Sequence, residues 1–159
     1  MAQITFISVG TLKEKYLTEA VGEYKKRLTQ FARVDEVELK EERIVDEDNT
    51  REIEAALDKE ADKILAAVPK DAYLVALCVE GKGYSSEELA KILGDAVDSR
   101  GKIAFVIGSS HGLSPRVKDA AHLRLSFSRL TFPHQLMRVM LYEATYRSFT
   151  ILAGKRYHK

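Results

Sequence analysis

Two polar loops in the C-terminal third of the sequence carry the residue types best suited to binding a small ligand. The loop GSSHGLSP (108–115) follows the apolar run IAFVIG, and a second loop follows LRLSFS and leads through Pro133 into a helix-like segment. Strand ends beside a helix N-terminus are where open α/β sheets bind nucleotide-like ligands. The backbone groups of such loops can bind an adenine edge, a ribose or a carboxylate. The sequence therefore predicts a ligand site between Ile103 and Tyr146.

Several familiar site motifs are absent. The sequence contains no GxxxxGK(S/T) phosphate loop, no GxGxxG, no GxSxG, and no cluster of His, Cys and carboxylates at metal-ligand spacing. Serine hydrolysis and zinc chemistry are therefore disfavoured, and no bound metal is expected. Cys78 is the only cysteine and lies in the apolar run AYLVALCV. We expect it to be a small core residue, neither part of a disulfide nor a thiol catalyst.

Charge is spread unevenly along the chain, although the net charge is only +1. Residues 35–63 include 13 acidic and 5 basic side chains, whereas residues 124–159 include five Arg and two Lys against the single Glu143. A basic C-terminal quarter favours a surface that faces phosphates, and the acidic segment would repel a polyanion. The alternative is that the two regions simply neutralise each other on one surface.

The hydrophobic pattern predicts alternating strands and helices around these loops. With 159 residues, of which 45% are hydrophobic, the chain is long enough for one domain spanning 1–159. Apolar runs predict strands at 3–9, 73–79, 102–107 and 123–128, and Val34, Val37 and Leu39 in a polar setting predict a further strand at 33–40. Helical spacing predicts helices at 12–31, 51–68, 86–98, 115–121 and 133–154. The alternation predicts an α/β fold, with helices on both faces of a mostly parallel sheet and 33–40 as an exposed edge strand.

The apolar residues of two of these helices allow further predictions about burial. Tyr16 and Tyr24 share the apolar face of helix 12–31, so we expect both in the core. The last helix is apolar on more than one stripe, through Leu136, Val139 and Met140 among others. A single sheet face cannot bury all of these side chains, so the helix is either enclosed within one subunit or packed against a second copy.

The N-terminus lacks the features of a targeting segment. The opening MAQITFISVG has no basic flank and only a short apolar run, which argues against a signal peptide. No later run reaches the length that spans a bilayer. We therefore expect a cytoplasmic protein with no membrane partner.

Three segments together resemble a known family. They are FVIG-xx-HGL, LSFSRLTFPHQLMRVMLYEATYR and the terminal YHK, and the segments ISVGTLKEKYLTEAVGEYKKRL and LCVEGKGYSSEELA match as well. In this order and spacing they resemble the ribosomal RNA large subunit methyltransferase H family, of the SPOUT class of S-adenosylmethionine-dependent methyltransferases. One departure is Ser109, where the family commonly has a second glycine; a side chain there narrows the backbone angles that the loop can adopt.

The resemblance implies a fold, a cofactor and a reaction. It implies a deep C-terminal trefoil knot within the α/β fold, a homodimer, and S-adenosylmethionine as cofactor. The implied activity is methylation of N3 of a pseudouridine in helix 69 of 23S ribosomal RNA. The implied cofactor contacts are Leu77, Gly108, Phe127, Ser128, Arg129, Leu130, Thr131 and Phe132.

Methyl transfer to an imide nitrogen needs positioning and removal of a proton. Most of the catalysis can come from holding the nucleophile and the methyl group at near-attack distance. The N3 proton must leave, and His158 is our candidate base, acting directly or through water, with Tyr157 stacked on the target base. We assign Arg138 to stabilising the resulting anion. His134, Arg147 and Lys159 are the candidate RNA contacts.

Non-catalytic interpretations stay open for the same residues. His158 could be a solvated terminal residue, and His134 could bond the backbone of its own loop. One of Arg138 and Arg147 could face a dimer partner while the other faces RNA, since their spacing does not place both on one helix face. A non-catalytic ribosome-binding protein and an enzyme of free nucleotides are the alternative functions. With no separate RNA-binding domain, we expect the substrate to be an assembled ribosome.

Overall fold

The computed structural model describes residues 1–159 and contains one sheet of five strands and five helices. The strands are β1 (Ala2–Val9), β2 (Ala32–Leu39), β3 (Tyr73–Lys82), β4 (Lys102–Ile107) and β5 (Leu123–Leu125). The helices are α1 (Lys15–Leu28), α2 (Thr50–Ala67), α3 (Ser86–Arg100), α4 (Pro115–Ala120) and α5 (His134–Leu152). All neighbouring strands pair in parallel, in the order β2-β1-β4-β3-β5. The predicted α/β fold is confirmed.

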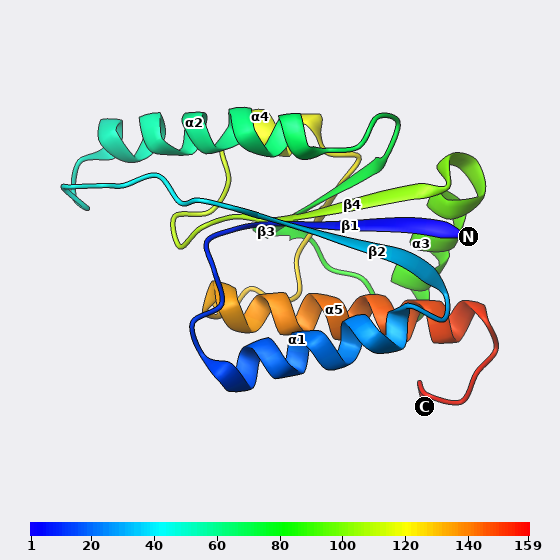
Figure 1. The fold of residues 1–159 in the computed structure, drawn as a ribbon. Helices are drawn as coiled ribbons and strands as arrows, with labels where there is room; N and C mark the ends of the chain where they lie inside the picture. Colours follow the sequence, from blue (N-terminus) through cyan, green and yellow to red (C-terminus); the bar gives the residue numbers. More distant parts are fainter.

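Helices cover both faces of the sheet (Figure 1). On one face α5 lies between α1 and α3 and contacts both, and on the other face α2 and α4 lie side by side. Strand β2 pairs only with β1, so the prediction of an edge strand is confirmed. Because all strands run in the same direction, the loops that follow β3, β4 and β5 emerge on one side of the sheet.

Each central strand is buried on both faces, which explains the continuous apolar runs in the sequence. In β1, Ile4 and Phe6 belong to the core beneath α1, α3 and α5, whereas Ile7 and Val9 belong to the core beneath α2 and α4. The ring of Tyr142 in α5 stacks on Phe6 with 3.8 Å between centroids. This contact fixes α5 against the middle of the sheet.

The position of Tyr16 differs from the prediction. Val21 and Leu28 are the buried residues of α1, and Tyr24 shares their face and is half-buried. Tyr16 is five residues before Val21, roughly 140° around the helix, and its side chain is 68% exposed. The prediction that Tyr16 belongs to the core was therefore wrong.

The last strand is shorter than the predicted 123–128. Strand β5 ends at Leu125, and the chain from Ser126 to Pro133 leaves the sheet as a loop. The Ser126 N–H still donates to the Lys82 carbonyl at 3.0 Å, so the loop begins tied to the end of β3.

Two further expectations concern the molecule as a whole. None of the five helices combines the length and the apolar composition needed to cross a bilayer. The C-terminal trefoil knot that the resemblance implies stays a prediction.

Candidate active site

A cavity of about 620 Å³ lies where β3, β4 and β5 end, beside the start of α5. Its volume is in the range of sites for small molecules and cofactors. Of the eight positions expected to contact a cofactor, those that line it are Leu77, Gly108, Phe127, Ser128, Leu130, Thr131 and Phe132. Arg129 is exposed and is not part of the lining. Three segments that are distant in sequence therefore meet around one space.

The loop between β4 and α4 is folded tightly on itself. The Gly112 N–H donates to the Ser109 carbonyl at 2.9 Å, and Gly112 has a φ of +85°. A Cβ at Gly108 would lie 2.3 Å from the Gly112 carbonyl oxygen, a distance that no side chain can tolerate. Only glycine at position 108 therefore permits this loop conformation.

The loop between β5 and α5 is held by its own hydroxyl groups. The Ser126 hydroxyl donates to the Ser128 carbonyl at 3.0 Å, and the Leu130 N–H donates to the Ser128 hydroxyl at 3.0 Å. These contacts are the local side-chain bonds that favour turns over regular structure. They explain why the chain leaves the sheet after Leu125.

Two cavity residues were not anticipated in this role. Cys78 is half-buried and lines the cavity, so the prediction of a core cysteine was wrong, and burial raises the pKa of its thiol. His111 also lines the cavity, and its Nε2 lies 2.7 Å from a carboxylate oxygen of Glu47. The positions of Cys78 and His111 in the sequence could have predicted this, because both lie at or directly after the end of a parallel strand. Residues there face the crevice at the carboxyl ends of the strands.

The lining suits an adenosine-like cofactor. Hydroxyl groups come from Ser109, Ser126, Ser128 and Thr131, and the apolar walls include Leu77, Ile107, Leu113, Phe127 and Met137. Hydroxyl and backbone groups can bind ribose and an adenine edge, while apolar walls bury a purine. Because position 108 must be glycine, the backbone can approach a ligand closely there. The residues present therefore fit S-adenosylmethionine.

The tail residues form a separate cluster on the C-terminal half of α5. His158 Nε2 lies 2.6 Å from a Glu87 carboxylate oxygen, and Nδ1 lies 3.1 Å from the Arg147 guanidinium. The Tyr157 hydroxyl donates to Glu143 at 3.1 Å, and the Arg147 guanidinium lies over its ring at 4.7 Å. Burial, together with Tyr24 and Glu143, raises the pKa of Tyr157 to about 12.

Within one chain, the tail does not reach the cavity. His134 lines the cavity at the start of α5, whereas Arg147 pairs with the tail farther along the same helix. At 1.5 Å per residue, these two positions are about 20 Å apart. Neither Tyr157, His158 nor the exposed Lys159 lines the cavity. The structure of one chain therefore separates the candidate cofactor site from the candidate base.

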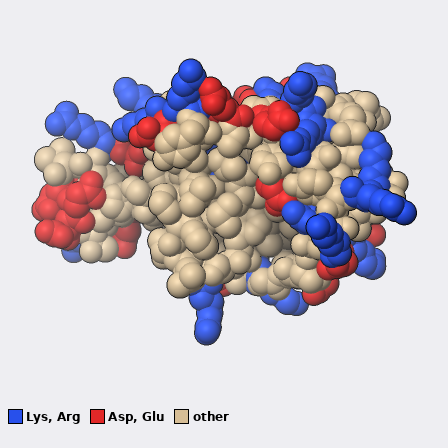
Figure 2. Space-filling model, turned by 90° about the horizontal axis from the view of Figure 1, so that it is seen from below, with Lys and Arg blue, Asp and Glu red and all other residues tan.

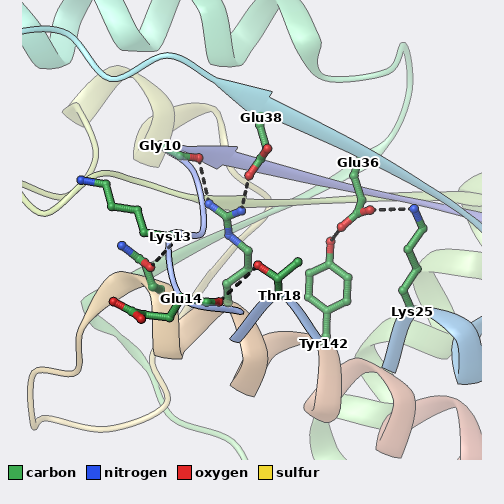
Figure 3. A network of polar contacts seen from close by, with 10 residues as sticks. Gly10, Lys13, Glu14, Thr18, Lys25, Glu36, Glu38 and Tyr142 are labelled. Carbon is green, nitrogen blue, oxygen red and sulfur yellow. Dashed lines mark hydrogen bonds and ion pairs between the residues drawn. The ribbon is translucent and has the colours of Figure 1, made fainter. Parts of the chain in front are cut away.

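Arg138 is buried between α5, β2 and the loop after β1, in a network whose members Gly10, Glu36, Glu38 and Tyr142 are labelled in Figure 3. Its side chain is 5% exposed, forms an ion pair with Glu38 at 2.7 Å and donates to the Gly10 carbonyl at 3.0 Å. One turn further along α5, the Tyr142 hydroxyl donates to Glu36 at 2.5 Å. Burial raises the pKa of Tyr142, and the hydrogen bond to Glu36 adds to the effect.

Carboxylates of β2 thus hold two successive turns of α5. Burial favours the neutral form of Glu36, but hydrogen bonds from Lys25 and Tyr142 outweigh this and lower its pKa. Arg138 is not among the residues that line the cavity. It connects the start of α5, which carries His134, to the loop at Gly10.

Comparison with known proteins agrees with this fold. The family model described as "Predicted SPOUT methyltransferase" matches residues 2–158. The chain therefore belongs to the SPOUT methyltransferase family.

Within this class, individual relatives match over nearly the whole chain. A ribosomal RNA large subunit methyltransferase H from Caldicellulosiruptor bescii is 51% identical over 156 residues, which cover 98% of this chain and 99% of the relative. The proteins of the same name from Caldicellulosiruptor saccharolyticus and Clostridioides difficile are 48% and 45% identical, with the same coverage.

Proposed function

We propose that this protein transfers a methyl group from S-adenosylmethionine to N3 of a pseudouridine in helix 69 of 23S ribosomal RNA. The observation that carries the proposal is the single cavity formed by the ends of β3, β4 and β5, lined by seven of the eight positions implied by the resemblance. The names of the relatives support a large-subunit ribosomal RNA substrate. The proposed substrate is the assembled ribosome and the proposed compartment is the cytoplasm.

The roles of the chain's own residues follow from their positions. Bound S-adenosylmethionine supplies an electrophilic methyl group. The loops at Gly108 and Phe127 would hold and orient the cofactor, so that positioning provides much of the rate enhancement. His158 would accept the N3 proton and Tyr157 would stack on the base, with His134, Arg147 and Lys159 near the RNA. For Arg138, the network with Glu38 supports a positioning role at the start of α5.

This mechanism requires two copies of the chain. Because Arg147, which contacts the tail, lies about 15–20 Å along α5 from the cavity residues Met137 and His134, we propose a homodimer in which the tail of one copy approaches the cavity of the other. A groove of about 410 Å³ on the outward side of α5 supports this. Its lining includes Glu143 and Arg147 of the tail cluster beside the apolar or aromatic residues Tyr24, Phe127, Val139, Met140 and Ala144. The face of the molecule formed by α1, α3 and α5 also has a broad area without charged side chains (Figure 2).

Mass spectrometry of ribosomal RNA tests the reaction. Cells that lack this protein should lack the methyl group on the helix 69 pseudouridine, and the purified protein with S-adenosylmethionine should restore it on isolated 70S ribosomes. Calorimetric titration with S-adenosylmethionine separates this function from that of a non-catalytic RNA-binding protein. The absence of cofactor binding, together with unchanged ribosomal RNA, would support the non-catalytic alternative.

A tail deletion tests the assignment of the base. A protein lacking Tyr157, His158 and Lys159 should bind the cofactor normally and methylate ribosomes at least 100-fold more slowly, because general-base catalysis typically contributes that much. His158→Gln keeps the size and polarity of the side chain and should show most of this loss. Methylation by both variants at the wild-type rate would exclude the tail from catalysis.

A further inference from the structure

One ion pair in the cavity wall has no part in the function described so far. Lys118 projects from α4, and its amino group pairs with the carboxylate of Glu80, which lies near the end of β3. Both residues line the cavity, and their side chains are 24% and 55% exposed, respectively. The hydrogen bond from Lys118 lowers the pKa of Glu80, which favours the charged carboxylate.

The rest of the lining carries no comparable charge. Lys118 and Glu80 are the only Lys, Arg, Asp or Glu side chains that line the cavity. Arg124, which is close enough to influence Glu80, is engaged by Asp119 at 2.9 Å and by the Lys118 carbonyl at 3.1 Å. One side of the cavity therefore presents a positive and a negative group together, and the remainder presents hydroxyl, imidazole and apolar groups.

This arrangement selects among ligand groups by charge. A phosphate would be attracted by Lys118 but repelled by Glu80 at similar range. A purine or a ribose is uncharged and would form an ion pair with neither Lys118 nor Glu80. A zwitterion with one ammonium and one carboxylate matches both, since each protein charge gains a partner when the pair opens and neither is left buried and unpaired.

We propose that Glu80 and Lys118 together bind the zwitterionic amino-acid end of the cofactor. The inference rests on the proposed function, because it takes S-adenosylmethionine as the ligand of this cavity. Lys118 would donate to the α-carboxylate and Glu80 would accept from the α-ammonium group. The adenosine portion would then lie along the hydroxyl-rich loops at Gly108 and Ser128. The pair thus determines the orientation of the cofactor in the cavity.

If the Glu80–Lys118 ion pair had only a structural role, a different result would be expected. A half-exposed ion pair between α4 and β3 could stabilise the fold slightly without touching any ligand. Removing either charge would then change the thermal stability but would alter the affinity for every ligand of the cavity to the same extent.

Two ligands that differ only at the amino-acid end distinguish these roles. S-adenosylhomocysteine retains the ammonium and carboxylate, whereas 5′-methylthioadenosine lacks both. Calorimetric titration with each ligand should show that Lys118→Met weakens S-adenosylhomocysteine binding about 10- to 100-fold, the usual worth of a charge-assisted hydrogen bond. The affinity for 5′-methylthioadenosine should stay within about twofold. Glu80→Gln should show the same selectivity with a smaller loss.

Lys91→Met is the matched control, because Lys91 lies on α3, pairs with Asp95 at 3.0 Å and is not part of the cavity lining. It removes the same charge and one ion pair and should change neither affinity. Equal losses for both ligands, or no loss for Lys118→Met and Glu80→Gln, would overturn the inference while leaving the proposed function intact. Failure of the wild-type protein to bind either ligand would overturn both.

Discussion

Arg138 and Glu60 are buried charged side chains with different surroundings. Arg138 has an ion-pair partner in Glu38 and an acceptor in the Gly10 carbonyl. Glu60, on α2, is 3% exposed and accepts one hydrogen bond, from the Glu42 N–H at 2.9 Å. Its second carboxylate oxygen has no hydrogen-bond partner. Arg138 Nε also lacks a hydrogen-bond partner, but Arg138 has a countercharge in Glu38, whereas Glu60 has no ion-pair partner. An unpartnered buried atom is costly, and most so when the charge itself is unpaired, so the two residues should respond to substitution in opposite ways.

Replacing Glu60 with Gln should stabilise the protein at neutral pH. Burial raises the pKa of Glu60, and the nearby Glu41 adds to this, while the hydrogen bond from the Glu42 N–H opposes it. Because the folded pKa is raised, ionisation of Glu60 costs stability as the pH rises above about 4.3. Glu60→Gln should gain about 1 kcal/mol at pH 7, the lower end of the cost of an unpaired buried polar group, or about 2–4 °C in Tm. The gain should shrink toward pH 4.

Thermal unfolding between pH 4 and pH 8 measures this effect. Glu54→Gln is the control, because Glu54 lies on the same helix and is exposed. It changes the net charge equally and should leave Tm nearly unchanged. A loss of stability in Glu60→Gln at pH 7 would mean that the carboxylate is needed in its charged form.

Replacing Arg138 with Met should destabilise the fold without weakening cofactor binding. Glu38 is about half exposed and can be rehydrated, so we expect a loss of about 2 kcal/mol, below the range for fully buried pairs. Denaturant unfolding measures this loss. In the same measurement, Tyr142→Phe should cost about 1 kcal/mol, because it removes one hydrogen bond to Glu36.

Calorimetry with S-adenosylhomocysteine gives the second measurement on the same variant. Its affinity for Arg138→Met should be unchanged at room temperature, because Arg138 is not part of the cavity lining. A normal stability with a weakened affinity would place Arg138 in the cofactor site instead.

At the scale of elements, the loop between β4 and α4 shows how one missing Cβ shapes the site. Ala at position 108 would place its Cβ against the Gly112 backbone, which cannot move aside as a flexible side chain can. Gly108→Ala should therefore open the loop, lower Tm and weaken S-adenosylhomocysteine binding at least tenfold, as measured by unfolding and calorimetry.

Gly22 provides the opposite case for the same substitution. It lies inside α1 and is exposed, and a Cβ at this position would meet no atom within 4 Å outside its own helix. Gly22→Ala should stabilise the protein by about 0.5–1 kcal/mol, since Ala loses less backbone entropy in a helix, and should leave ligand binding unchanged. Similar effects of the two substitutions would contradict the loop geometry.

At the scale of the whole molecule, the outward side of α5 is the surface on which the proposed homodimer would form. Leu136 is 38% exposed and Met140 lines the groove on this side. Met140→Glu should produce a monomer in sedimentation velocity, because a charge cannot be buried unpaired in an apolar interface. The monomer should still bind S-adenosylhomocysteine but should not methylate ribosomes, since each cavity would lack the tail of the other copy.

Val45→Glu is the control for this experiment. Val45 is 78% exposed and lies in the loop before α2, away from the groove. This variant should keep the oligomeric state and the activity of the wild-type protein. An active Met140→Glu monomer would show that one chain contains a complete site.

The sequence by itself determined the elements and the place of the cavity. Apolar runs marked the central strands, with 102–107 matching β4 throughout, because strands buried on both faces need continuous apolar side chains. The alternation of strands and helices requires a parallel sheet, and parallel strands bring the loops after Leu77 and Gly108 to the same edge. These features follow from local patterns, so they could be predicted without coordinates.

Only the tertiary structure decided which charged and aromatic side chains are available for chemistry. Arg138 is neutralised by Glu38, a residue 100 positions away, and His158 is held by Glu87, which is 71 positions away. The exposure of Tyr16 depends on which face of α1 meets α5 and the sheet, and the pairing of Lys118 with Glu80 depends on where α4 lies beside β3. Such contacts join distant segments, and no local pattern of residues encodes them, because they form only when the elements pack.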